Sequence, residues 1–306
     1  MKVKKIIVIL IFAAVTKIGL AQQDPMFTHY MNNTLWLNPA YAGTRDLLTV
    51  TGIHRSQWVG FDGRPKSQSF SMHAPLVLGK SGAGLNVVND QLGVTKSTWI
   101  TMDYSYQIRL NSKAKLAMGI KGLVNIFRNN VSTLKLYNQN DAAFASDVQS
   151  ILPNAGFGLY YYTKKYYVGL SCPKILQNQL NTSASLLSRE QRHYYLITGY
   201  AFDINRNVVF KPTSFIKVTP GAPIQGELTG TFVFSDLVNI GLMYRSGDAF
   251  GALVGINVSD QLHVGYSFDW SMANTSGKYN SGSHEICLRY DFFVKPETKI
   301  KSTRHF

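Results

Sequence analysis

The chain has 306 residues and a formal net charge of +14, yet only 16% of its residues are charged and 12% are aromatic. Its two cysteines exclude a disulfide framework and a four-cysteine metal site, so we interpret Cys172 and Cys287 as buried small residues. The lysines and arginines are dispersed, which does not fit the basic block of a nucleic-acid-binding protein. The composition is typical of a large soluble β protein or of an outer-membrane barrel.

Residues 1–21 have the parts of a secretory signal peptide. Early lysines precede an apolar stretch from Ile6 to Val15, and small residues precede the expected cleavage point before Gln22. An uncleaved anchor is the alternative, but about ten apolar residues are fewer than the roughly 20 of a spanning helix. Cleavage lowers the formal charge from +14 to +10, because the segment carries four lysines and no acidic residue. The remaining charge suits contact with an anionic membrane surface.

Residues 22–45 form an irregular segment that includes QDPMFTHYMNNTLWLNPAYAG. Pro25 and Pro39 exclude a regular helix or a central strand across it. If a membrane barrel follows, the segment begins on the periplasmic side, ahead of the first strand. We expect it either to fold into the lumen as a plug or to lie across the periplasmic mouth as a contact surface.

Residues 46–293 are predicted to form about fourteen β-strands, because apolar and polar residues alternate in one stretch after another. In WITMDYSYQIRL, from Trp99 to Leu110, the even positions are apolar and most odd positions are polar. The predicted strands are residues 46–55, 67–75, 82–89, 97–110, 114–126, 153–163, 166–172, 192–204, 207–218, 223–234, 237–245, 249–258, 261–270 and 283–293.

A soluble sandwich also alternates, but the connections favour a barrel. Short connections such as NSKA, TKK and NR alternate with long ones such as SQWVGFDGRPK, residues 127–152 and residues 173–191. Outer-membrane barrels have short periplasmic turns and longer outer loops, and closure removes the exposed sheet edges. The sequence therefore predicts an all-β fold: a transmembrane antiparallel up-and-down β-barrel, plugged or capped on the periplasmic side by the N-terminal segment. Residues 294–306 are predicted to be a basic periplasmic tail.

Aromatic residues near predicted strand ends fit the girdles expected at the two lipid interfaces. The alternative is that tyrosine is simply common in strands. The residues concerned are Tyr160, Tyr161, Tyr162, Tyr166, Tyr167, Trp99 and Trp270.

Charged residues at the polar positions of the strands are expected to face the lumen. They either line a water channel, pair in a network around an inserted segment, or represent ordinary lumen polarity. Glu285 is expected to pair with Arg289 or with a residue of the neighbouring first strand, such as Arg55. The expected lumen residues are Asp103, Arg109, His263, Asp269, Glu285, Arg289 and Asp291.

Catalytic signatures are absent from the sequence. It contains no GxSxG, HExxH, P-loop or CxxC motif, and no GxGxxG that opens a helix after a strand. The seven histidines are dispersed singly. We therefore expect no enzyme activity, cofactor, metal site or nucleic-acid partner, although a hydrolase with Ser and His on separate strands stays open.

Several motifs, in order along the whole chain, resemble the PorP/SprF family of type IX secretion system membrane proteins. Each motif alone is weak, but their shared order and spacing make the resemblance specific. They are DPMFTHYMNNTLWLNPAYAG from Asp24, HRSQWVGFDGRP from His54, GAGLNVVNDQLG from Gly82, LPNAGFGLYYY from Leu152, GLMYRSGDAFGALVG from Gly241, GYSFDWS from Gly265 and GSHEICLRYDF from Gly282.

The resemblance implies a Bacteroidota outer-membrane protein that serves export or surface attachment of cargo with C-terminal sorting domains. Such cargo includes large adhesins, and some members of the family are linked to gliding motility. Members are non-enzymatic accessory barrels, so the implied partners are secretion components, cargo and outer-membrane lipid. The basic tail KPETKIKSTRHF is a departure from the family pattern, and its charge suits a peptidoglycan-binding periplasmic protein.

The residues expected to bind partners or to hold the structure are carried over from these motifs. Trp58, Gly60 and Gly63 lie on the predicted first outer loop and are expected to contact cargo or to anchor that loop, and His284 and Glu285 begin the last strand. The full set is Asp24, Pro25, Tyr30, Asn38, Pro39, Ala40, Tyr41, Gly43, His54, Arg55, Trp58, Gly60, Gly63, Asn89, Asp90, Arg245, Asp269, His284 and Glu285.

A transport barrel for a hydrophobic or small solute is the alternative function. Asn38, Pro39 and Ala40 bear a short likeness to the long-chain fatty-acid transporter family, which also has an inserted N-terminal hatch. The downstream NDQLG, RSGDA and HE matches favour the secretion family.

Overall fold

The computed structural model describes residues 24–134, 147–180, 189–272 and 281–292. The predicted signal peptide and the predicted basic tail lie outside the described residues. No helix within the described ranges is long and apolar enough to cross a membrane.

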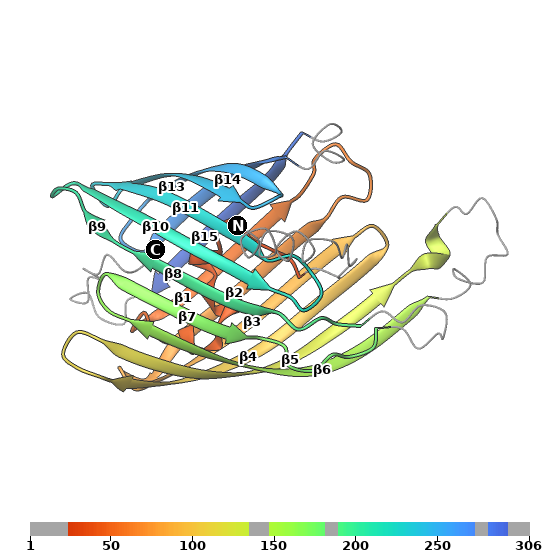
Figure 1. The fold of residues 1–306 in the computed structure, drawn as a ribbon, viewed down its shortest axis with the longest axis horizontal. Helices are drawn as coiled ribbons and strands as arrows, with labels where there is room; N and C mark the ends of the chain where they lie inside the picture. The colour runs from red at the N-terminus through yellow and green to blue at the C-terminus, as the bar shows by residue number, and fades with distance from the viewer. Residues whose placement is uncertain (1–23, 135–146, 181–188, 273–280, 293–306) are drawn as a thin grey trace, which may run out of the picture.

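The described strands form a closed antiparallel barrel (Figure 1). Neighbours in sequence are neighbours in the sheet, β10 pairs with β11, and β1 pairs with β15. Since β8 and β9 both pair with β10, they count as one spanning strand, and the predicted barrel of fourteen strands is confirmed. The strands are β1 Leu48–Ser56, β2 Lys66–Val77, β3 Ser81–Leu92, β4 Thr95–Arg109, β5 Lys115–Asn129, β6 Val148–Tyr162, β7 Tyr166–Cys172, β8 Tyr194–Tyr200, β9 Phe202–Asp203, β10 Val208–Val218, β11 Gln225–Phe234, β12 Val238–Arg245, β13 Ala249–Asn257, β14 Leu262–Ser271 and β15 Ser283–Phe292.

The two ends of the barrel differ in their connections. One end, called the turn end here, carries residues 78–80, 110–114, 163–165, 204–207, 235–237 and 258–261. The other, called the long-loop end, carries residues 57–65 and 219–224 and the described parts of the connections 130–147, 173–193 and 272–282. The connections 93–94 and 246–248 are short although they lie at the long-loop end, because Gly93 and Gly247 adopt the positive φ angles that tight hairpins use. The strands β5 and β6 extend past the end of β7 at the long-loop end (Figure 1).

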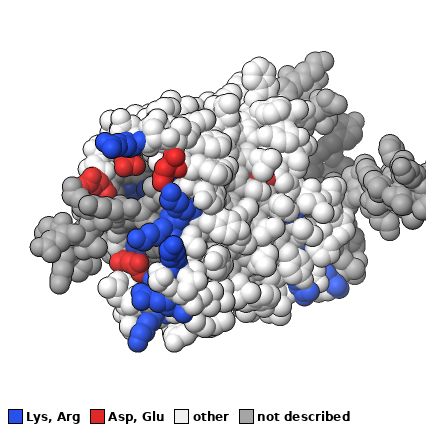
Figure 2. All heavy atoms as spheres, turned by 60° about the vertical axis from the view of Figure 1, so that its left-hand side comes forward, with Lys and Arg blue, Asp and Glu red and all other residues white. Residues whose placement is uncertain are grey.

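The outer face of the wall is apolar and exposed, as a lipid-facing surface requires. Figure 2 shows a broad band with few charged side chains, and lysines and arginines gathered toward the turn end. The prediction that Arg109 faces the lumen is wrong, because it is the last residue of β4 and lies exposed at the turn end. The other exposed cations there are Lys80, Lys113, Lys164, Lys165 and Arg206.

The predicted aromatic girdle is only partly correct. Trp99, expected at a lipid interface, is 5% exposed and packs in the lumen against Trp36. Tyr160, Tyr162 and Tyr167 also point inward, because they occupy lumen-facing positions of β6 and β7. The girdle instead consists of alternate, outward residues in ring contact from strand to strand. These are Tyr161, Tyr166, Tyr200, Phe202, Phe210 and Phe232, while Trp270 is exposed near the other end.

The N-terminal segment, red in Figure 1, lies inside the lumen and is a plug, not a cap. Its elements are short: η1 Tyr30–Asn32, α2 Thr34–Leu37 and η2 Pro39–Tyr41. Asn38 divides the last two, and its side-chain oxygen accepts the Ala40 backbone N–H at 2.9 Å. Pro39 fits the start of η2, where no backbone N–H is needed.

The wall is shaped to the plug by residues that lack a side chain. A Cβ on Gly119 of β5 would lie 2.5 Å from the Pro39 carbonyl carbon. A Cβ on Gly158 of β6 would lie 2.9 Å from Cγ of Asn38. Backbone and plug therefore pack with no space left for even one methyl group at these positions.

The substitution Gly119→Ala is expected to destabilise the protein, since the added methyl overlaps the plug. Overpacking of this kind costs about 1–3 kcal/mol. The control is Gly122→Ala on the same strand, whose Cβ would meet nothing within 4 Å. The urea midpoint of the detergent-solubilised barrel should fall for Gly119→Ala only. Equal midpoints for the two variants would contradict a tightly fitted plug.

Candidate functional site

The interface between plug and wall runs the whole height of the barrel. Asp24 lies at the long-loop end, beside Lys174 just after β7. Arg45 lies at the turn end, beside Asp291 near the end of β15. The described part of the plug thus begins at the long-loop end and descends to the start of β1.

At the long-loop end, Asp24 is held by three wall groups. Its carboxylate accepts a hydrogen bond from Lys174, lies 3.5 Å from Nε2 of His193 and accepts one from the Tyr195 hydroxyl at 3.4 Å. Burial raises the pKa of Asp24, but Lys174 and His193 together outweigh burial and bring that pKa to about 2. Burial also lowers the pKa of His193 to about 4, so this imidazole is neutral at pH 7. Asp24 and Lys174 therefore form the ion pair that fixes the plug at the long-loop end of the barrel.

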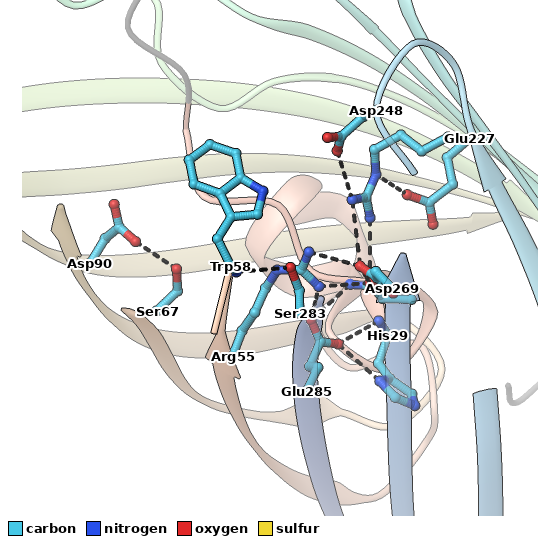
Figure 3. A network of polar contacts seen from close by, with 12 residues as sticks. His29, Arg55, Trp58, Ser67, Asp90, Glu227, Asp248, Asp269, Ser283 and Glu285 are labelled. Atoms are coloured by element: carbon cyan, nitrogen blue, oxygen red, sulfur yellow. Dashed lines mark hydrogen bonds and ion pairs between the residues drawn. The ribbon is translucent and has the colours of Figure 1, made fainter. Parts of the chain in front are cut away.

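Nearer the middle of the barrel, Glu285 of β15 binds the plug backbone directly (Figure 3). Its carboxylate accepts the backbone N–H groups of Thr28 at 2.9 Å and His29 at 2.7 Å, and the His29 ring nitrogen Nδ1 lies 2.9 Å away. Arg55 of β1 lies 3.2 Å from the same carboxylate, so the predicted pairing of Glu285 with Arg55 is confirmed. Glu285 thus joins the plug to the first and last strands.

Asp269 of β14 extends this cluster to a second arginine. Arg55 contacts its carboxylate at 2.7 Å and Arg245 of β12 at 3.6 Å, while the Thr28 hydroxyl donates to it at 2.7 Å. Arg245 also binds Glu227 of β11 at 2.8 Å. Because these groups are almost fully buried, removal of any one of the charged side chains leaves the charges of the remaining groups unbalanced.

At the turn end, Arg45 of the plug binds Asp291 at 2.7 Å. Arg289 donates to the side-chain oxygen of Asn32 at 2.8 Å and lies 3.5 Å from Asp291. Of the two partners predicted for Glu285, Arg289 is therefore the one that pairs elsewhere. Asn32 and Arg45 are thus bound by β15, as Thr28 and His29 are.

The middle of the plug is held through its backbone carbonyl groups. Lys121 of β5 donates to the carbonyl oxygens of Leu35 at 3.2 Å and Trp36 at 2.9 Å, and lies 3.5 Å from Asp103. These carbonyls end the single turn of α2, where no backbone donor follows. Ser171 likewise donates to the carbonyl of Leu37 at 2.7 Å.

The structure brings together most of the residues selected from the sequence motifs. The central cluster unites Arg55, Arg245, Asp269 and Glu285. Asn38 donates to the Leu159 carbonyl at 2.9 Å and so anchors the plug to β6. Seven other selected residues belong to the plug: Asp24, Pro25, Tyr30, Pro39, Ala40, Tyr41 and Gly43.

Other selected residues lie apart from this cluster. His54 is exposed on the outer face, and His284 points outward, where it bonds the Tyr266 hydroxyl at 2.7 Å. Asn89 and Asp90 lie near the end of β3, and Asp90 accepts a hydrogen bond from Ser67 at 2.5 Å (Figure 3). Trp58, Gly60 and Gly63 lie in the loop 57–65, where all three have positive φ angles.

Sequence reasoning missed several residues of the interface between plug and wall, among them Lys174, Ser171 and Arg45. Thr28 and His29 lie in the quoted motif, but nothing in it distinguishes them from their neighbours. Glu227 and Lys121 carry a weak signal, since each is a charge at a lumen-facing position of a predicted strand. Within the described ranges, no group of three or more His, Cys, Asp or Glu side chains is arranged to hold a metal ion.

The substitution Glu285→Gln is expected to lower the free energy of unfolding by about 3–5 kcal/mol, because the buried Arg55 loses one of its two carboxylate partners. The urea midpoint of the folded barrel measures this loss. Lys165→Gln is the control, since it removes an ion pair with Asp203 that is exposed to water and should not change the midpoint. A Glu285→Gln protein as stable as the wild type would show that the cluster does not hold the plug.

The fold is shared with a solved structure at a TM-score above 0.5. The chain is similar to a solved structure described as the CymD monoaromatic hydrocarbon channel, at 11% identity and a TM-score of 0.51, over 90% of this chain and 95% of that one. It is similar to a Pseudomonas aeruginosa FadL homologue, at 12% identity and a TM-score of 0.48, over 86% and 94% of the chains. It is also similar to Omp33 of Acinetobacter baumannii, at 10% identity and a TM-score of 0.44, over 80% and 98%. At such identities the likeness concerns the fold alone.

No curated protein matches the chain in sequence. A family model described as "Type IX secretion system membrane protein PorP/SprF" matches residues 19–290. That match includes the plug and nearly the whole barrel. The barrel fold and the family together make the protein an integral component of the outer membrane. The chain therefore belongs to the PorP/SprF family of type IX secretion system membrane proteins.

Proposed function

We propose that this protein is a non-enzymatic accessory component of the type IX secretion system, needed for export or surface attachment of cargo with a C-terminal sorting domain. Family membership supports a role in that system. The observation that carries the accessory role is the plug, which fills the lumen from the long-loop end to the turn end. Because the plug occupies the lumen, we place the path of the cargo elsewhere.

The long-loop end is the surface we assign to cargo. There the loop 57–65 pairs with the segment before β15, since the Val59 N–H donates to the Gly282 carbonyl at 2.8 Å and the Ser281 N–H to Val59 at 2.7 Å. Trp58 has a φ of 52°, which is unusual for a bulky residue, and strained backbone of this kind gathers at binding sites. Its ring points away from the Arg55 and Glu285 cluster in Figure 3.

The turn end is proposed to face the periplasm, in keeping with other outer-membrane barrels. Its exposed cations favour an anionic partner, and the proposed basic tail, residues 294–306, would add to that charge. A peptidoglycan-binding periplasmic protein is the partner we propose for this end. The proposed domains are thus the signal peptide 1–21, the plug 22–45, the barrel 46–293 and this tail.

An epitope inserted before Asp24 is expected to be accessible to antibody on intact cells. The reason is that the plug begins at the long-loop end, which we place outside, whereas the sequence led us to expect it to begin on the periplasmic side. The matched control is the same epitope between Lys164 and Lys165 in a turn, which should be detected only after the outer membrane is permeabilised. The reverse pattern of labelling would contradict the proposed orientation.

Deletion of the gene in its own organism should remove one or a few large proteins with C-terminal sorting domains from the cell surface. Mass spectrometry of surface, medium and cell fractions would identify them. A variant with residues 57–65 replaced by a Gly/Ser linker should restore the barrel without restoring the cargo. The control, with residues 163–165 replaced in the same way, should restore both.

An unchanged set of surface and secreted proteins would contradict the accessory role and favour the alternative, a transport barrel for a hydrophobic or small solute. The observation behind that alternative is a cavity of about 50 Å³ between the plug and the wall of β10–β14. Conductance of the purified protein in planar bilayers would then be expected.

A further inference from the structure

The cavity beside the plug brings together two histidines that are far apart in sequence. It is lined by His29 and Met31 of the plug and, on the wall, by Lys211, Asn239, Leu253 and His263. His29 belongs to the plug, whereas His263 lies on β14. Neither the plug alone nor the barrel alone contains this pair.

Both imidazoles direct a nitrogen toward one point over Gly265. The position that a Cβ on Gly265 would occupy lies 2.9 Å from Nε2 of His29 and 3.5 Å from Nε2 of His263. The space that a side chain would fill is therefore bordered by two imidazole nitrogens. A glycine at this lumen-facing position is what leaves that space open.

Hydrogen bonds on the far side of each ring determine which nitrogen carries the proton. Nδ1 of His29 lies 2.9 Å from the carboxylate of Glu285, an acceptor, so this nitrogen donates. Nδ1 of His263 lies 2.7 Å from the side-chain oxygen of Asn257, whose own amide donates to the Asp236 carbonyl at 2.6 Å. In the neutral rings both Nε2 atoms are therefore unprotonated acceptors, and both border the space over Gly265. Two acceptors that converge require a shared donor or a cation.

We propose that His29 and His263 form a binding site for a divalent transition-metal ion of the class that prefers imidazole, such as Cu²⁺, Ni²⁺ or Zn²⁺. Metal-binding histidines characteristically donate their other N–H to a carboxylate or amide oxygen, and Glu285 and Asn257 occupy these positions. The side-chain oxygen of Asn239 lines the same cavity, is buried and has no hydrogen-bond partner. It is suited to be a third ligand, with water in the remaining positions.

Positive charges around the site limit its affinity for a metal cation. Lys211 lines the cavity, and Arg289 and Arg45 lie below it at the turn end. Glu285 and Asp291 offset part of this positive charge. We therefore expect binding in the micromolar range, weaker than at a closed structural zinc site.

A second cavity, of about 520 Å³, lies at the turn end and is lined by Asp203, Asp236 and Arg206. It shares Val233 with the inner cavity. The inner cavity therefore lies next to an opening at the turn end.

Titration of the metal-free, full-length protein in detergent with Cu²⁺ tests the proposal. The expected result is one bound Cu²⁺ per chain, with an electron paramagnetic resonance spectrum that shows coupling to two imidazole nitrogens. His263→Gln should weaken binding by at least about tenfold. Gly265→Ala should do the same while keeping both histidines, because its methyl would lie between their Nε2 atoms.

His73→Gln is the matched control, since His73 is also a buried lumen histidine but lies outside the cavity. It should bind Cu²⁺ as the wild type does. Heat-dependent migration on gels would verify that each variant is a folded barrel. The proposal is overturned if folded wild-type protein binds no Cu²⁺, or if His73→Gln loses as much affinity as both cavity variants. Because the test measures binding alone, its result is independent of the proposed role in secretion.

Discussion

The structure depends on one constraint: a polypeptide placed inside a barrel has to find partners for its polar groups in the barrel wall. An unpaired buried N–H or C=O group costs about 1–3 kcal/mol, and the short turns of the plug leave backbone groups such as the Thr28 N–H and the Trp36 carbonyl to be paired by the wall. Glu285 accepts two plug N–H groups, and Lys121 donates to two plug carbonyls. The charges of the lumen therefore follow from the conformation of the plug.

Shape and charge act together in this arrangement. The close approach at Gly119 and Gly158 brings the plug backbone near enough for Asn38 and Ser171 to bond across the interface. Ion pairs at Asp24 and Arg45 then fix its two ends. Because the polar groups of the lumen pair with the plug, the loops and turns at the two ends are the surfaces left for partner proteins.

Much of the barrel was predictable from the sequence, because lipid and lumen impose opposite chemistry on successive residues. Tyr104 and Met102 point to lipid and Asp103 to the lumen, as the period of two requires. The period fails where the plug makes part of the lumen apolar: Trp99 packs against Trp36 instead of lying at a membrane interface. Pairing of Glu285 with Arg55 was predictable because the first and last strands are neighbours in any closed barrel. The contacts of His29 and Lys121 were not, since they depend on the path of an irregular segment.

The distribution of plug contacts between the first and last parts of the chain bears on how the protein reaches its native state. Thr28, His29, Asn32 and Arg45 find their partners on β15, the last strand to be synthesised. Until that strand pairs with β1, these groups lack their partners on β15, and the barrel has an open seam. Closure of the seam and capture of the plug are thus one cooperative event, in which the final strand completes the surroundings of the first residues. A chain that lacks β15 can therefore neither close its sheet nor pair the polar groups of its plug that bind that strand.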